Sequence, residues 1–272
     1  MSTELYAVQH IRRMRGGSQA HLMRASNGHY FVVKFQNNPQ HIRVLANEMF
    51  ATRLAHWLGL PVPRVEVIEV SDWLVTHSPE LRVELGDTAT PCSSGRQLGS
   101  QYPDPELAIF DYLPETLFNQ VANLGDFVRM LVLDKWVGNA DGRQAVFTRK
   151  PRGRRYHATF IDQGYAFNAG DWDFPDAALR GVYAQNCVYK DVTRWESFEP
   201  ALTKAEEADI IDIWRCAEPI PPEWYEHDRE GLERIVETIH HRRTMIRDLI
   251  KSFRTSSRDP FPNWRDNQTG CG

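Results

Sequence analysis

The chain has 272 residues, of which 42% are hydrophobic, so it can bury the core of one large domain or of two lobes that share a cleft. Its formal net charge of −4 gives the whole molecule no electrostatic reason to bind nucleic acid directly. No apolar run reaches the roughly 18 residues of a membrane span, and the first residues contain no apolar signal core. We therefore expect a cytoplasmic protein without membrane contact. The four cysteines, Cys92, Cys187, Cys216 and Cys271, form no CxxC pair and are expected to be reduced thiols.

The first third of the chain is expected to be mostly strands around one helix. An Asn-Gly turn at residues 27–28 is typical of a hairpin. Aromatic and β-branched residues follow over residues 29–35, as in a strand. Apolar residues then recur at helical spacing over residues 42–58, and Gly59 ends that helix. The next strand is expected over residues 65–70.

The middle of the chain contains many turn-forming residues. Residues 78–105 are rich in Gly, Pro and Ser, which predicts a long loop or a short insertion. Residues 107–114 form a short apolar run that Pro114 ends. This run is typical of a strand that becomes the connector between two lobes.

The second half of the chain is expected to be largely helical. Helices are predicted from Asp126 onward and over residues 229–253, with a pair of strands at residues 144–148 and 156–161 between them. A β-rich lobe, a connector and a helical lobe with one hairpin give an α+β, two-lobed, protein-kinase-like fold. We therefore expect a β-rich N-lobe over residues 1–113 and a mainly helical C-lobe over residues 114–272.

Phosphoryl transfer from ATP requires few parts. A glycine-rich turn must approach the phosphates, and a lysine held by a carboxylate must neutralise them. One further carboxylate must orient the attacking hydroxyl, and another must hold Mg²⁺. The chain has a candidate for each part, in that order.

The glycine-rich candidate is the turn formed by Gly16, Gly17, Ser18 and Gln19. Glycines between two strands let backbone N–H groups point at phosphate oxygens. The alternative is an ordinary hairpin turn. The turn is not a Walker A loop, because no Gly-Lys-Ser/Thr follows it.

Lys34 lies in a run of apolar residues that are expected to be buried, so its ammonium group needs a partner. Glu48, 14 residues later on the predicted helix, can supply it. The alternative is an exposed lysine on an edge strand. A lysine in a cleft is expected to contribute little to stability.

Two polar turns flank the predicted hairpin. Asp141 lies in the first, where it could orient a hydroxyl nucleophile, and Gln144 could offer its amide oxygen to a metal. Asp162 ends the second strand just before Gly164, a position that suits a Mg²⁺ ligand. Both segments could also be ordinary surface turns. The ends of a two-stranded hairpin lie together, so Asp141, Gln144 and Asp162 are predicted to share one cleft.

These segments resemble the HipA-like kinases. The most specific similarity is over residues 47–63, which begin Asn-Glu-Met-Phe and end Leu-Gly-Leu-Pro-Val-Pro, and over the Gly-Asn-Ala-Asp-Gly turn at 138–142. The turn at 16–19 is similar to the family's phosphate loop, and the Val-Val-Lys run ending at Lys34 to its lysine strand. Residues 161–164, Ile-Asp-Gln-Gly, resemble the family's metal-binding segment and that of the related type II phosphatidylinositol 4-kinases.

The resemblance implies the use of ATP and Mg²⁺ and the phosphorylation of Ser or Thr on a protein. It would assign the phosphates to Lys34, the lysine partner to Glu48, the catalytic carboxylate to Asp141 and the metal to Asp162. A kinase-like connector would lie beside the adenine, and the candidates there are Phe110, Asp111, Tyr112 and Leu113.

The chain also departs from the family. Arg143 stands where HipA proteins usually have His, and it could neutralise phosphate. Val146 stands where they have an Asn metal ligand, for which Gln144 could substitute as a weak second ligand. Two other readings therefore stay open: a pseudokinase-like nucleotide-binding regulatory module, and a small-molecule phosphotransferase. The sequence identifies neither the acceptor nor an antitoxin-type partner nor the oligomeric state.

Overall fold

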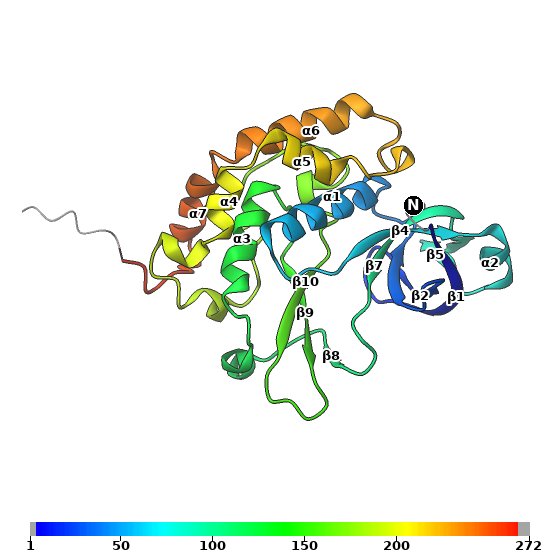
Figure 1. Cartoon of the computed structure of the whole chain (residues 1–272), viewed down its shortest axis with the longest axis horizontal. Coiled ribbons are helices and arrows are strands. Elements are labelled where there is room, and N and C mark those ends of the chain that lie inside the picture. The colour runs from blue at the N-terminus through cyan, green and yellow to red at the C-terminus, as the bar shows by residue number, and fades with distance from the viewer. Residues whose placement is uncertain (1–3, 266–272) are drawn as a thin grey trace, which may run out of the picture.

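The computed structural model describes residues 4–265. The N-terminal part is a closed five-stranded barrel (Figure 1). Its strands follow the order β1 (Leu5–Arg13), β2 (His21–Ala25), β3 (Tyr30–Lys34), β7 (Gly95–Gln101) and β4 (Val65–Val70). Neighbouring strands are antiparallel except β1 and β4, which pair in parallel and close the barrel. The strands expected at residues 29–35 and 65–70 are confirmed.

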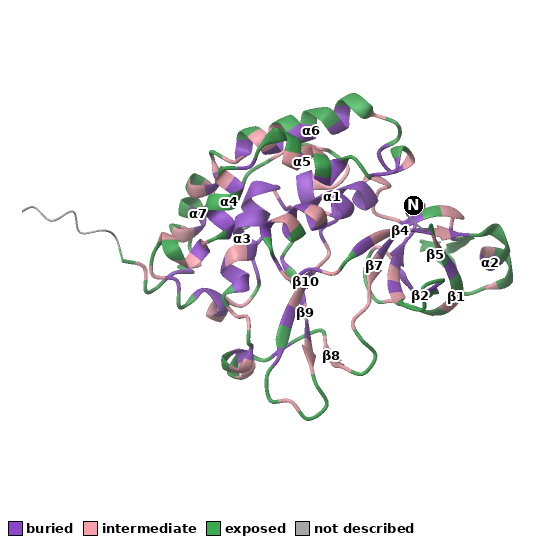
Figure 2. Ribbon diagram, viewed as in Figure 1, coloured by how far each residue is buried: buried purple, intermediate pink, exposed green. Residues whose placement is uncertain are grey.

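Helix α1 (Arg43–Leu58) lies between the barrel and the helical part of the molecule (Figure 1). It is the helix expected over residues 42–58. Twelve of its residues are buried, and the burial colouring of Figure 2 shows little exposed surface along it. Its apolar side chains join a large core cluster that continues into the C-terminal helices. The barrel interior forms a second, smaller cluster.

Of the long loop or short insertion expected over residues 78–105, the loop is wrong, and only part of the region is a separate hairpin. This region contains an exposed hairpin, β5 (Arg82–Leu85) and β6 (Thr88–Pro91), which follows the short helix α2 (Asp72–His77). It also contains β7, which pairs with both β3 and β4 in the barrel. Of the glycines that suggested a loop, Gly86 lies in the turn between β5 and β6, whereas Gly95 starts β7 and Gly99 lies within it. At Gly99 a Cβ atom would lie 2.5 Å from Cγ1 of Ile68, so this glycine allows close packing against the neighbouring strand β4.

The expected connector also needs correction. Residues 108–110 form β8 (Ala108–Phe110), which pairs with β9 (Gln144–Arg149) in a second sheet with β10 (His157–Ile161). The barrel therefore ends at Gln101, and residues 102–107 link the two sheets. The apolar run at 107–114 suggested a connector because a strand of three residues is too short for its sequence pattern to differ from that of a linker. The lobe boundary at residue 113 stays a prediction.

Five α-helices form the C-terminal part of the described chain: α3 (Asp126–Trp136), α4 (Ala201–Glu206), α5 (Ile210–Ala217), α6 (Arg229–Arg242) and α7 (Ile246–Arg254). The hairpin β9–β10 and the helix from Asp126 are as expected, and the architecture is α+β. The single helix expected over 229–253 is two, α6 and α7. The side-chain hydroxyl of Thr244 donates to the carbonyl oxygen of His241 between them, a local bond that competes with the helix.

Within residues 4–265 no helix has both the length and the apolar character needed to cross a bilayer. Cys92, Cys187 and Cys216 are free thiols, as expected, whereas Cys271 lies outside the described residues.

Candidate active site

Lys34 is the last residue of β3, and its ammonium group links two acidic side chains. Nζ donates a hydrogen bond to Oε2 of Glu48 on α1, and another to Oδ1 of Asp162 at 2.9 Å. Lys34 is only 7% exposed and Glu48 3%. Glu48 Oε1 also accepts a hydrogen bond from the Ser100 hydroxyl of β7 at 3.5 Å. The barrel, α1 and the end of β10 thus meet at one buried charge cluster.

The charges of this cluster depend on one another. Burial alone would lower the pKa of Lys34, but the negative charges of Asp162 and Glu48 outweigh it and raise that pKa above its usual value. The positive charge of Lys34 lowers the pKa of Asp162. Burial raises the pKa of Glu48, although Lys34 opposes this shift. Lys34 is therefore held protonated and Asp162 ionised.

The β9–β10 hairpin brings the other acidic candidate to the same place. Gln144 pairs with Ile161 at the open end of the hairpin, so the residues before β9 and after β10 are neighbours. The amide Nε2 of Gln144 donates to Oδ2 of Asp162 at 3.3 Å and to Oδ2 of Asp141 at 3.5 Å. The structure thus brings Asp141, Gln144 and Asp162 together, as the sequence predicted.

The backbone around Asp162 has an unusual conformation and packs closely against α1. Asp162 has a φ of +60°, a left-handed conformation that is uncommon for a residue with a side chain. Two residues later, a Cβ on Gly164 would lie 2.5 Å from Cγ1 of Val44, so only glycine lets this segment approach α1. Asn47 of α1 donates from Nδ2 to the carbonyl oxygen of Gly164 at 3.1 Å. Helix α1 therefore fixes both the partner of Lys34 and the segment that carries Asp162.

Arg143 is a structural residue of this site that the sequence did not identify as one. Its Nε donates to Oδ2 of Asp134 on α3 at 3.0 Å, its Nη2 pairs with Oδ1 of the same carboxylate, and both side chains are at most 2% exposed. Nη1 donates to the carbonyl oxygen of Ile161 at 2.9 Å and, more weakly, to that of Asp162 at 3.4 Å. The expectation that Arg143 could neutralise phosphate is wrong, because its guanidinium points into the core.

The turn that carries Asp141 is anchored to the same buried carboxylate. Asn139 donates from Nδ2 to Oδ1 of Asp134 at 2.9 Å, and its Oδ1 accepts a hydrogen bond from the backbone N–H of Asp141 at 3.1 Å. Oδ1 of Asp141 accepts from the N–H of Gly142 at 2.7 Å. Asp141 itself is exposed. Its carboxylate is thus held in direction while it stays accessible to a hydroxyl group.

The glycine-rich turn is tied to the β5–β6 hairpin. The side chain of Gln19 pairs with the backbone of Glu84: its Nε2 donates to the carbonyl oxygen at 2.7 Å and its Oε1 accepts from the N–H at 2.8 Å. Arg13 forms an ion pair with the Glu84 side chain at 2.8 Å. Gly16 and Gly17 are exposed and Ser18 is half-buried. The side chain of Gln19 is therefore occupied, and a phosphate contact in this turn would involve backbone N–H groups.

The four adenine candidates have different environments. Phe110 contacts the ring of Tyr156 edge-on, with 5.3 Å between ring centroids. Leu113 is buried in the large core, whereas Tyr112 is 67% exposed and Asp111 is also exposed. These residues follow the connector at 102–107 and do not form it. Their contact with a nucleotide base stays a prediction.

Mg²⁺ prefers oxygen ligands and retains several waters or phosphate oxygens. Asp162 and Asp141 supply carboxylate oxygens, and Gln144 supplies an amide whose oxygen and nitrogen would exchange places on rotation of the amide group. Among residues 4–265 no group of three or more His, Cys, Asp or Glu side chains is arranged to hold a metal. The donors fit a magnesium ion that is shared with a nucleotide phosphate, and they do not form an all-protein metal cage.

The HipA-like kinase family model matches residues 8–253. Similar solved structures include the Helicobacter pylori proinflammatory kinase CtkA, with 14% identity over 87% of this chain and 94% of that chain and a TM-score of 0.51. The Golgi casein kinase has 15% identity over 93% of this chain and 73% of that chain, with a TM-score of 0.54.

A third similar structure is HipA of Shewanella oneidensis, solved in a complex with HipB and operator DNA. It has 12% identity over 94% of this chain and 75% of that chain, with a TM-score of 0.50. No curated protein matches the sequence. At these identities the structural matches show the fold, which is the two-lobed kinase-like fold expected from the sequence.

Proposed function

The chain belongs to the HipA-like kinase family, and from that premise we propose that it transfers the γ-phosphoryl group of ATP, with Mg²⁺, to a Ser or Thr hydroxyl of a protein. The observation that carries the proposal is the convergence of Lys34, Asp162, Gln144 and Asp141, which consecutive hydrogen bonds of 2.9 to 3.5 Å connect. These groups come from distant parts of the sequence and are the parts that phosphoryl transfer needs.

Each residue has a defined task in the proposed reaction. Lys34 exchanges its contact with Asp162 for a phosphate oxygen, while Glu48 continues to hold its ammonium group. Asp162 and the amide oxygen of Gln144 would hold the metal, which when bound would offset the negative charge of the phosphates. Asp141 orients the acceptor hydroxyl and accepts its proton as the new O–P bond forms and the bond to the ADP oxygen breaks.

One specific observation supports a second candidate, a pseudokinase-like nucleotide-binding module. Val146 stands where the family has an Asn ligand, and a valine side chain has no oxygen to offer a metal. It is half-buried in β9 and pairs with Thr159. Gln144 then has to act alone beside Asp162. In this reading ATP binds while transfer is absent. A small-molecule phosphotransferase would instead transfer phosphate to a sugar or similar hydroxyl without a protein acceptor.

The test is transfer from γ-labelled ATP to the protein itself and to a Ser/Thr peptide library, with ATP binding measured in parallel. Asp162→Asn is expected to abolish transfer. Asp141→Asn is expected to abolish transfer but to leave ATP binding within about twofold, because its task concerns the hydroxyl. Gln144→Ala is expected to raise the Mg²⁺ concentration needed for half-maximal rate.

The matched control is Asp191→Asn, an exposed carboxylate in the C-terminal part of the chain, which is expected to leave the rate unchanged. Transfer by Asp162→Asn at the parent rate would contradict the metal assignment and the kinase proposal with it. ATP binding by the parent with no transfer to any acceptor would favour the pseudokinase-like module.

A further inference from the structure

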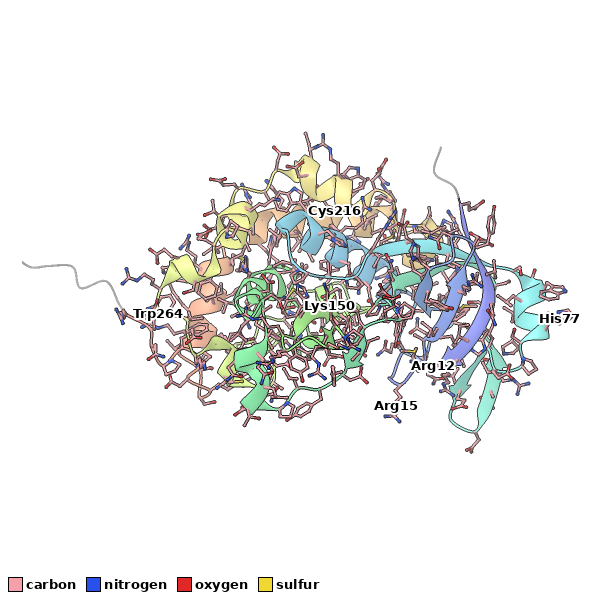
Figure 3. The ribbon with its side chains drawn as sticks, turned by 60° about the horizontal axis from the view of Figure 1, so that its bottom comes forward. Arg12, Arg15, His77, Lys150, Cys216 and Trp264 are labelled. Atoms are coloured by element: carbon pink, nitrogen blue, oxygen red, sulfur yellow. The ribbon has the colours of Figure 1, made fainter. Side chains whose placement is uncertain are left out.

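A hollow lies away from the proposed catalytic residues and is lined in part by Met49 and Arg53 of α1. Its volume is about 1110 Å³, and it is bordered by α1, β4, α5 and the start of β1. Lys34, Glu48 and Asp162 do not line it. Figure 3 labels Cys216 of α5, which lines the hollow where α5 packs on α1. This volume of about 1110 Å³ is slightly above the roughly 300–1,000 Å³ of most small-molecule sites in proteins.

Part of the lining of the hollow is apolar. The side chains that form it come from four segments distant in sequence: Leu5, Met49, Val65, Val67, Cys216 and Pro221. Trp57 adds an indole ring from the last turn of α1. These apolar side chains can pack on the hydrophobic part of an organic ligand, and charged side chains line the rest of the same hollow.

Most charged groups around the hollow are already paired. Arg64 pairs with Glu66, Arg215 with Asp212 at 2.9 Å, and Arg96 with Glu223 through two hydrogen bonds of 2.5 and 2.6 Å. Each of these guanidinium groups therefore has its counter-ion within the protein.

Arg53 differs from these arginines. The ion pairs formed around the hollow by residues 4–265 do not include Arg53, and its Nε is buried without a hydrogen-bond partner in that part of the chain. Its Nη2 makes one long hydrogen bond of 3.3 Å, to the carbonyl oxygen of Arg215. A buried N–H donor without an acceptor is unfavourable, and the planar fork of Arg fits a carboxylate with two parallel bonds.

We propose that this hollow binds an organic monocarboxylate with an apolar body, whose carboxylate is held by Arg53. The charge of the lining explains why a single negative charge is required. Four arginines and four acidic residues line the hollow. Glu66 and Asp212 are paired with arginines, whereas Glu4 and Glu69 form no ion pair within residues 4–265 and would repel a ligand with two negative charges more than one with a single charge. One carboxylate matches the one guanidinium, that of Arg53, which has no counter-ion there. The apolar body packs on Met49 and Val67. The ligand would contact both the barrel and helix α5.

The experiment is a titration with 3-phenylpropionate in the absence of ATP, followed by NMR of ¹³C-methyl-labelled methionines. The Met49 methyl signal, assigned with Met49→Leu, is expected to shift in a saturable way. Met23 in the barrel core serves as the reporter that the fold is unchanged. The neutral analogue 3-phenylpropionamide is expected to bind at least tenfold more weakly, because it cannot form the charged fork.

Arg53→Gln is expected to weaken 3-phenylpropionate at least tenfold, and Arg53→Lys to weaken it less, because Lys keeps the charge but not the fork. Arg24→Gln, an exposed arginine on β2, is the matched control and is expected to leave binding unchanged. An unmoved Met49 signal in the parent would overturn the proposal. Equal binding of the acid and the amide, or equal binding by Arg53→Gln, would also overturn it. The result does not depend on kinase activity, since binding is measured without ATP.

Discussion

At the scale of single residues, Lys34 has two tasks, because it completes the charge balance of the site and also holds three elements together. From the sequence, a lysine in a cleft was expected to add little to stability. The structure gives a different expectation, since Lys34 is buried and forms ion pairs with Glu48 and Asp162. Its presence on β3 and its pairing with Glu48 could be predicted from the apolar run around it. Its contact with Asp162, 128 residues later, could not.

Lys34→Met is therefore expected to lower the free energy of unfolding by about 3 kcal/mol at neutral pH, because it leaves the buried carboxylate of Glu48 and the half-buried one of Asp162 without their partner. Urea denaturation of the parent and the variant measures this difference. Arg24→Met on the exposed face of β2 is the control and is expected to change stability by about 0.5 kcal/mol or less. A loss as small as that of the control would contradict the structural task of Lys34.

The pH dependence of this loss follows from the pKa shifts. The raised pKa of Lys34 contributes stability that is lost only as pH rises through the pKa of Lys34 in the folded protein. The lowered pKa of Asp162 contributes stability that is lost as pH falls through the pKa of Asp162 in the folded protein. Both contributions are present at neutral pH. Without Lys34, protonation of Glu48 or Asp162 relieves the repulsion, so the difference between parent and variant is expected to be smaller at pH 5 than at pH 7.5.

At the scale of elements, strand β7 illustrates what the sequence did not reveal. Its residues Gly95, Gly99 and Ser100 have low strand propensity, so the pattern favoured a loop. The glycine at position 99 is needed because Ile68 and Phe31 pack against its Cα from neighbouring strands. Close packing from elsewhere in the chain thus overrides the local preference, and a single sequence does not show it.

Gly99→Ala is expected to destabilise the protein by about 1–3 kcal/mol, because the new Cβ would lie 2.5 Å from Cγ1 of Ile68 and 3.2 Å from Cδ1 of Phe31. Gly125→Ala is the matched control: Gly125 has a φ of −61°, and a Cβ there would approach only the flexible end of Arg129 at 3.8 Å. Thermal or urea unfolding measures both changes. Equal effects of the two substitutions would show that close packing does not determine the residue at position 99.

The buried pair of Arg143 and Asp134 joins α3 to both strands of the β9–β10 hairpin. Arg143→Gln leaves the carboxylate of Asp134 buried without its counter-ion, and a loss of about 3–5 kcal/mol is expected. The double variant Asp134→Asn, Arg143→Gln removes both charges and is expected to be more stable than Arg143→Gln alone. A double-mutant cycle in urea measures this coupling, and additive losses would contradict it.

At the scale of the whole molecule, the sequence predicted the order of the two lobes and the hairpin that carries the acidic residues. The lobe order and the hairpin could be predicted because both depend on local sequence patterns and on one short turn. Contacts between the lobes were not predictable in this way. The fork between Arg96 of β7 and Glu223 joins residues 127 positions apart, and α1 packs against both α3 and α5. Residues 102–107 form the connector, because β8 already pairs with β9 in the second sheet. This pairing between distant residues has no local signal in the sequence.

The arrangement of the two lobes leads to the last prediction. The proposed nucleotide site is formed by Lys34 and Glu48 from the N-terminal part and by Asp141 and Asp162 from the hairpin, so only the folded chain contains it. Mg²⁺ and ATP together are therefore expected to stabilise the fold, by about 2.7 kcal/mol when ATP is present at 100 times its dissociation constant. Thermal unfolding with ATP alone, with Mg²⁺ alone and with both measures this effect. The full shift in Tm is expected only with both, and Asp162→Asn is expected to lose the part that depends on Mg²⁺. A shift of equal size in Asp162→Asn would mean that the metal is held elsewhere.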